Sequence, residues 1–449
     1  MQLQRDPSQA GFSMVELMVA LVLGVILTSG VISVFISSKN TYNTNNSLGQ
    51  VEEGGRYALN FMQPILTMAG NTGCSRPGDS RQQAGYTDYI PTTGMIINSA
   101  YASGPEPGTS WAPMYNFALP VFGYEATGTG INATIPSNGG ETVSGGVETY
   151  PSPDTSPADW SPALNWNDPK NVLSGAVNIN GVGGVLKYND VLMVHEALTT
   201  TAIGGGSATV IGTGADSSAV YVPASTSSAT VTAANFNVGE FAIASTCTNT
   251  GTTAFQITSV TGSTGALGYA AAPPTGTPGN NSGSSLQNLV TAVGYSVLPA
   301  STYVFYVGQG ADKGPALFEG YLATSGANAG KFVTEQLVSG VENMQVLYGV
   351  DTDQDQIPNY FTTADQVQSG TGGPSAGGNA NWGSVVSVRV SLVMQSDNFS
   401  IDKASASTTN VYMLGSGRGY TDNTILATPA DQRMRRVFVE TFSFRNMLP

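Results

Sequence analysis

Residues 11–36 read GFSMVELMVALVLGVILTSGVISVFI, and this stretch decides how the chain begins its fold. From Phe12 to Ile36 it carries a single charge, Glu16. At helical rise these residues span roughly 37 Å, which is enough to cross a bilayer. The run is longer than the apolar region of a secretory signal, and it passes through Lys39 without a small-residue cleavage site. We therefore expect residues 12–36 to form a retained membrane helix.

The residues before this helix, MQLQRDPSQAG, are polar and include one basic residue, Arg5. By the positive-inside tendency, this short segment belongs on the cytoplasmic side. Everything after Lys39 is then expected outside the cytoplasm.

Gly11 stands at the boundary between polar and apolar sequence, and Glu16 lies inside the apolar run. This arrangement resembles the N-terminal signal of type IV prepilins. The resemblance implies that residues 1–11 are a leader peptide, that a prepilin peptidase cuts after Gly11, and that the new terminus at Phe12 is methylated. In a filament, Glu16 would neutralise the amino terminus of a neighbouring subunit, because an uncompensated charge buried among apolar helices costs several kcal/mol. The alternative is that Glu16 reaches back to the interface of an ordinary membrane anchor.

The helix is expected to continue beyond the membrane, to residue 70. Apolar residues recur on one face at spacings near three, four and seven, namely Leu48, Val51, Ala58, Met62 and Ile65. Glu52 and Arg56 add an i,i+4 ion pair. The polar run at 40–47 and the pair Gly54-Gly55 are poor helix formers, so we expect a frayed or bent middle.

Residues 71–449 show alternating polar and apolar runs separated by Gly, Ser, Thr and Pro clusters, which predicts a large antiparallel β-rich head and an α+β fold class. The expected strands are 190–196, 241–245, 255–260, 303–307, 344–350 and 385–394. In the last of these, Ser387, Arg389 and Ser391 share one face, which we expect to be solvated. The segments 200–236, 261–288 and 369–381 are expected to be inserted surface loops without a core of their own.

Four blocks of the chain resemble the PilW group of minor pilins. They are GRYALNFMQPILTMAGNTGC at 55–74, STCTNTGTTAFQIT at 245–258, LVSGVENMQVLYGVDTDQDQ at 337–356 and RRVFVETFSFRN at 435–446. The resemblance implies a type IV pilin-like fold and a minor pilin that primes pilus assembly and joins the tip complex. The implied partners are other minor pilins, the major pilin, the inner-membrane assembly machinery and a large tip adhesin. The implied locations are the inner membrane, with the head in the periplasm, before assembly and the pilus surface afterwards.

The charge balance argues against nucleic acid as a partner. The chain has 16 Lys and Arg against 30 Asp and Glu, a formal net charge of −14, which opposes the neutralisation of phosphates. Catalysis is not expected either: His195 is the single histidine, and it lies on a predicted strand as a structural residue. The sequence has no phosphate-binding loop, zinc spacing or nucleophile elbow.

Cys74 and Cys247 are the two cysteines, and in an oxidising compartment they are expected to form a disulfide between helix and sheet. Two buried free thiols are the alternative.

Asp351, Asp353 and Asp355 alternate just after a predicted strand, with Asn359 close behind. Several oxygen ligands in irregular geometry suit calcium. However, Gln356 replaces the glycine of an EF-hand loop, and Thr362 stands at the position of its closing glutamate. A solvated acidic turn is the alternative interpretation.

Two rival functions remain open from sequence alone. A minor pseudopilin of a type II secretion system would carry the same N-terminal signal. A surface adhesin or glycan-binding module would use the inserted loops or residues 109–173, which hold three of the four tryptophans, Trp111, Trp160 and Trp166.

Overall fold

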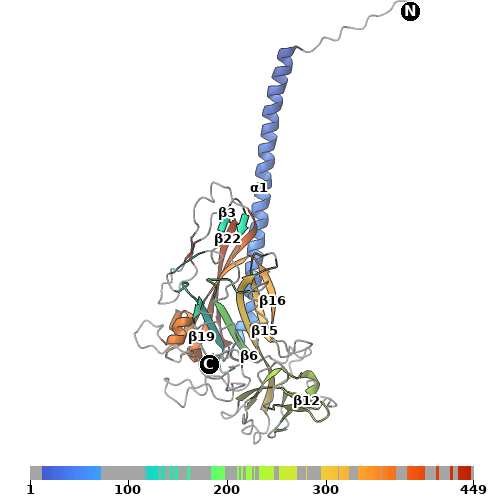
Figure 1. Ribbon diagram of the computed structural model, residues 1–449, viewed down its shortest axis with the longest axis vertical. Coiled ribbons are helices and arrows are strands. Elements are labelled where there is room, and N and C mark those ends of the chain that lie inside the picture. The colour runs from blue at the N-terminus through green and yellow to red at the C-terminus, as the bar shows by residue number, and fades with distance from the viewer. Residues whose placement is uncertain are drawn as a thin grey trace, which may run out of the picture.

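The computed structural model consists of one long helix and a β-rich head, and the helix projects from one end of the head (Figure 1). The structure describes residues 13–71, which contain the helix and the few residues that follow it. The described residues of the head are 117, 119–130, 133–136, 142–144, 147–149, 159–161, 184–197, 210–211, 214–215, 219–224, 227, 232–246, 252–270, 280, 295–311, 313–322, 332–353, 355–370, 382–399, 411–413, 425–427 and 433–445.

Helix α1 (Met14–Thr67) is 54 residues long and begins at Ser13, whose Oγ accepts a hydrogen bond from the Val15 N–H at 3.3 Å. The helix runs without interruption through residues 40–47 and through the glycine pair, so the expected frayed or bent middle is wrong. In the polar stretch, the Thr41 hydroxyl donates back to the Ser37 carbonyl at 3.0 Å, so this hydroxyl is satisfied within the helix. The second half of α1 is held by packing against the head.

Among the described residues, the largest sheet has nine strands, with the central order β11-β10-β14-β6-β1-β5; β7 and β15 pair with β14, and β16 pairs with β15. These strands are β1 (Val121–Ala126), β5 (Trp160–Ser161), β6 (Val191–Ala197), β7 (Val210–Ile211), β10 (Phe241–Thr246), β11 (Thr252–Gln256), β14 (Tyr295–Gln309), β15 (Pro315–Leu322) and β16 (Phe332–Ser339). All of its pairings are antiparallel, as the alternating pattern predicted.

A second sheet has the antiparallel order β18-β17-β19-β22. Its strands are β17 (Val341–Val350), β18 (Tyr360–Thr362), β19 (Val385–Phe399) and β22 (Arg433–Ser443). Helix α1 packs across β19 and β22. The apolar face predicted for residues 385–394 therefore lies under the helix.

In the described part of the chain, the remaining strands form three small sheets. The first comprises β8 (Gly214–Ala215), β9 (Ala219–Tyr221), β12 (Ser259–Thr261) and β13 (Ala266–Gly268); the second β2 (Thr134–Pro136), β20 (Val411–Met413) and β21 (Ile425–Ala427); the third β3 (Thr142–Ser144) and β4 (Val147–Thr149). Strands β2 and β21 run parallel. Three short helices complete the description: α2 (Ala364–Ser369), η8 (Ala233–Asn235) and η11 (Trp382–Ser384).

Glycines allow α1 to approach the second sheet closely. A Cβ atom at Gly55 would lie within 3.0 Å of three carbons of the Phe438 ring on β22, and one at Gly54 would lie 2.8 Å from the Met394 Cε on β19. The pair Gly54-Gly55, which predicted an irregular helix, therefore allows α1 to pack closely on the sheet. Because glycine has no side chain, the side chains of the sheet fit against the helix backbone.

Asp190 joins the two large sheets. It directly precedes β6, and its carboxylate accepts the Ala126 N–H of β1 at 3.0 Å and the Val346 N–H of β17 at 2.8 Å. Its own N–H donates to the Met344 carbonyl of β17 at 3.1 Å. Asp190 is 2% exposed, so its two oxygens satisfy backbone groups that have no access to water.

Two strand predictions are wrong in detail. The single strand expected at 255–260 is two strands, β11 and β12, because Ile257 and Thr258 carry the chain from the large sheet into a small one. The face of β19 expected to be solvated is covered at Ser387 and Ser391, which are 1% and 3% exposed. On this face, the Arg389 guanidinium sits 4.2 Å from the ring centroid of Phe361, which belongs to β18 of the same sheet.

The stretches expected to be loops without a core include strands and a second hydrophobic core. We call residues 219–270, where described, the distal module; its core contains Val220, Val222, Ala233, Phe236, Ala242, Ala244, Phe255, Ile257, Leu267 and Tyr269, with Val297 of β14. It lies at the end of the head opposite the helix tip, near the β12 label in Figure 1. The apolar residues of this core are spread over several short strands, so no single segment of the sequence indicated it.

The glycine contact predicts opposite effects for two similar substitutions. We expect Gly55→Ala to lower the free energy of unfolding by about 1–3 kcal/mol, because its Cβ would press into the Phe438 ring. Gly49→Ala is the control: a Cβ there meets nothing within 4 Å, so it should stabilise the helix by up to about 1 kcal/mol. Thermal unfolding of the full chain in detergent measures both. Equal changes in the free energy of unfolding for the two variants would show that the close approach of α1 to β22 does not affect stability.

The Asp190 bridge predicts a graded loss of stability. Asp190→Ala leaves two buried N–H groups without an acceptor, at a cost of about 1–3 kcal/mol each. Asp190→Asn keeps one acceptor oxygen and should lose less. Glu53→Gln, on the exposed face of α1, should change stability by less than about 0.5 kcal/mol. Chemical denaturation of the full chain provides the comparison, and wild-type stability in Asp190→Ala would contradict the bridge.

Candidate functional site

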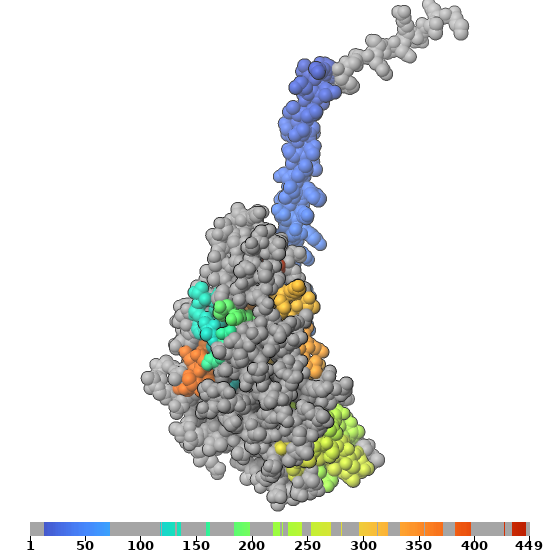
Figure 2. Space-filling view, in the orientation of Figure 1, coloured from blue at the N-terminus to red at the C-terminus, as the bar shows by residue number. Residues whose placement is uncertain are grey.

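The apolar half of α1 is the most unusual surface of the chain. Every large apolar side chain from Met14 to Ile36 is at least 51% exposed. Figure 2 shows this part of the helix, in blue, standing clear of the head. By length and composition α1 could cross a membrane. Such a surface calls for a lipid or protein environment, since water is a poor solvent for a continuous apolar helix.

The predicted processing site lies at the beginning of this helix. Gly11 and Phe12 are outside the described residues. Glu16 lies in the first turn of α1, where its charge also favours the positive end of the helix dipole. Its side chain is exposed and available to a neighbouring chain.

Charged residues mark the place where α1 reaches the head. Glu52 forms the predicted ion pair with Arg56, at 3.8 Å, and a second ion pair with Arg436 of β22. Sequence reasoning found the first pair from its i,i+4 spacing but missed Arg436, because the two residues lie far apart in the chain. Glu52 therefore links the helix to the edge of the second sheet.

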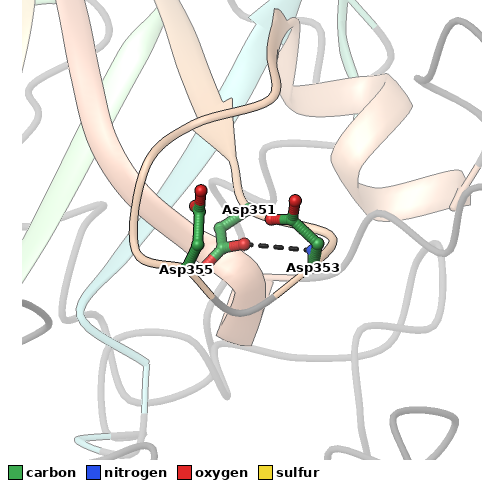
Figure 3. A group of neighbouring side chains, drawn as sticks. All are labelled: Asp351, Asp353 and Asp355. Atoms are coloured by element: carbon green, nitrogen blue, oxygen red, sulfur yellow. Dashed lines mark hydrogen bonds between the residues drawn. The ribbon is translucent and has the colours of Figure 1, made fainter.

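The three aspartates predicted to bind calcium do lie together (Figure 3). Their nearest carboxylate oxygens are all within 4.8 Å of one another. Asp351 is buried at the end of β17, and its carboxylate accepts the N–H groups of Asp353 at 3.2 Å and Gln356 at 2.9 Å. Asp353 and Asp355 are exposed. One buried carboxylate thus organises the loop, and two others stand at its surface.

Two further residues shape this aspartate loop. Gln356 has a φ of 67°, the left-handed conformation for which an EF-hand loop uses glycine. The Asn359 side-chain oxygen accepts both the N–H and the hydroxyl of Thr352, at 2.6 and 2.9 Å. Asn359 therefore closes the loop in this structure through Thr352.

The other predicted residues are only partly placed. Cys74, Cys247, Trp111 and Trp166 lie outside the described residues. Trp160 is 2% exposed, and its indole N–H donates to the Asn189 carbonyl at 2.9 Å, which makes it a core residue. His195 is 1% exposed and packs edge-on against Phe117, as a structural histidine would.

Comparisons with known proteins point to one family. A family model described as Type IV Pilus-assembly protein W matches residues 304–446, which run from within β14 to just past β22 and include the aspartate loop. A second model, the prokaryotic N-terminal methylation motif, matches residues 6–32. The first match includes two of the four blocks quoted above, 337–356 and 435–446, and the second covers Gly11, Phe12 and Glu16.

The other comparisons add less. A type IV-like pilin from Thermus thermophilus is similar at 14% sequence identity, over 33% of this chain and 67% of that chain, with a TM-score of 0.20. That likeness is too distant to carry any inference. No curated protein sequence matches the chain significantly.

The match to the pilus-assembly family covers the sheet that holds α1, and the methylation motif covers the exposed start of the same helix. The helix fits membrane anchoring, and the family indicates a structural role in pilus biogenesis in place of a catalytic one. These two matches support the assignment of the chain as a PilW-like type IV pilin.

Proposed function

We propose that this pilin is a minor pilin that primes the assembly of type IV pili and remains in the complex at the pilus tip. The observation that carries this proposal is the division of α1 into an exposed apolar half and a half packed on the head. The exposed half would pack against the helices of other minor pilins and of the major pilin. The docked half would keep the head at a defined angle to that bundle.

Maturation would begin at the membrane. In the proposed sequence, the chain inserts in the inner membrane with its head in the periplasm, and a prepilin peptidase cuts after Gly11 and methylates Phe12. The assembly machinery then transfers the chain to the filament. There Glu16 of one subunit would neutralise the amino terminus of its neighbour, which would otherwise be a buried, uncompensated charge.

The head would face away from the filament core and end in the distal module. That position suits contact with a large tip adhesin and a role in adhesion or twitching motility. A minor pseudopilin of a type II secretion system would share the helix, but the PilW match favours the pilus.

Substitution of Glu16 tests the assembly step. We expect Glu16→Gln to reduce the protein in sheared filaments more than about tenfold, because removing one partner of a buried charge pair costs about 3–5 kcal/mol. Its amount in membranes should not fall. Glu53→Gln, which alters an exposed carboxylate on the docked half of the helix, is the matched control. Quantitative immunoblots of the two fractions provide the readout, and equal incorporation of both variants would refute the assigned role.

N-terminal mass spectrometry of the same fractions tests processing. A methylated Phe12 terminus in filaments is the expected result. An intact Met1 terminus confined to membranes would reject the filament function and leave an anchored protein.

The aspartate loop supports a second, subsidiary proposal: it binds one calcium ion. Asp351, Asp353 and Asp355 would supply carboxylate oxygens, and the conformation of Gln356 gives the backbone the turn that such loops need. An ion there would offset the repulsion among three clustered carboxylates and hold the loop between β17 and β18.

A calcium titration of the full chain in detergent tests this proposal. At a hundred times the dissociation constant, the ion would stabilise the fold by about 2.7 kcal/mol, which raises the unfolding temperature by several degrees. Asp353→Asn should weaken the effect, while Glu53→Gln should leave it unchanged. Magnesium should act more weakly, because it demands octahedral geometry. The absence of any calcium-dependent shift in wild type would refute the site.

A further inference from the structure

Three ionisable side chains are buried in the seam between the two large sheets. Glu125 comes from β1, Asp190 from the residue before β6, and Tyr348 from β17; they are 4%, 2% and 1% exposed. None of them belongs to α1 or to the aspartate loop.

Both carboxylate oxygens of Asp190 accept hydrogen bonds from backbone N–H groups, one on β1 and one on β17. Glu125 is different. Its Oε1 accepts the Thr129 hydroxyl at 3.0 Å, but its Oε2 is buried without a hydrogen-bond partner. The Tyr348 hydroxyl is also buried without a partner.

Glycine brings the phenol close to the glutamate. Gly123 lies two residues before Glu125 on β1, so the two residues face the same side of the strand. The Tyr348 hydroxyl occupies the place that a Cβ atom at Gly123 would take. The unpartnered hydroxyl therefore lies against β1 at Gly123, on the face of the strand that carries the Glu125 side chain.

The charged groups acting on Glu125 are carboxylates. Asp190 and, from α2, Asp365 both disfavour its ionised form, while the Thr129 hydroxyl and the Ala364 N–H favour it. Burial is the largest effect, and it raises the pKa of Glu125 well above its usual value. Burial also raises the pKa of Asp190, to about 7, and that of Tyr348. Lys187, close by in the chain, is paired with Asp159 at 3.0 Å.

We propose that Glu125, Asp190 and Tyr348 form a proton-controlled latch between the two sheets. With a proton on Glu125, the seam holds one neutral carboxyl group beside Asp190 and stays closed. Loss of that proton places adjacent negative charges in a buried site and loosens the contact between β1 and β17. The head is therefore most stable at mildly acidic pH and becomes less stable as the pH rises.

The sign of the pH dependence follows from proton binding. Because the folded state holds the proton more tightly than the unfolded state, the stabilisation is complete below the unfolded pKa, near 4.5 for a glutamate. It is lost as the pH rises through the folded-state pKa. Each proton released on unfolding changes the unfolding equilibrium constant about tenfold per pH unit. Glu196 and Glu319, whose pKa values burial raises to about 8 and about 7, add to the wild-type slope in the same direction.

The test therefore compares variants of the full chain in detergent, with EDTA present, from pH 5 to pH 9. Glu125→Gln copies the protonated carboxyl group and should release about one proton fewer on unfolding, so its unfolding temperature falls less steeply with pH. Glu53→Gln is the exposed control and should keep the wild-type slope. A wild-type slope in Glu125→Gln would overturn the proposal.

Infrared difference spectroscopy supplies a second readout that does not depend on unfolding. At neutral pH, wild type should show the carbonyl band of a protonated carboxyl group, and Glu125→Gln should lose that component. Asp365→Asn, which removes a repulsive charge from the neighbouring helix, should shift the titration of the band to lower pH. If Glu125→Gln does not fold, this shift decides the matter, and an unchanged titration rejects the latch.

A cation in the seam would also contradict the proposal. It would appear as calcium-dependent stabilisation that survives Asp353→Asn but disappears in Glu125→Gln.

Discussion

The close packing of α1 on β19 and β22 is the contact on which the rest of the structure depends. Gly54 and Gly55 bring the helix backbone against Met394 and Phe438, and Glu52 adds an ion pair at the edge of the sheet. Since one rigid helix carries both the docked and the exposed half, this contact also sets the direction in which the apolar half leaves the head. The geometry of assembly is therefore decided inside the head.

The second constraint is polar. Where the two sheets meet, Asp190 accepts one backbone N–H from a strand of each sheet. Tyr188, with a φ of 59°, makes the tight turn that places this carboxylate there. The solution has a cost, because it concentrates acidic groups where water cannot screen them. Proton binding by Glu125 is a physical way to reduce that cost.

The match to the pilus-assembly family covers one part of the head and not another. Residues 304–446 contain the sheet that docks the helix, whereas the distal module lies outside this match and has its own core. Short strands among many Gly, Ser, Thr and Ala residues made the distal module resemble a loop in the sequence.

Much of the fold was determined by local sequence. The apolar run, the position of Glu16 and the alternation along 344–350 and 385–394 were sufficient for the helix, the antiparallel sheet and the family resemblance, because periodicity and hydrophobicity are local properties. The convergence of Asp351, Asp353 and Asp355 was equally local. Three features depend on tertiary contacts: Gly54-Gly55 is a packing surface, Ser387 and Ser391 are buried, and Glu125, Asp190 and Tyr348 share a seam. Such features arise from contacts between distant segments, and a residue's own neighbours in sequence do not reveal what will lie against it.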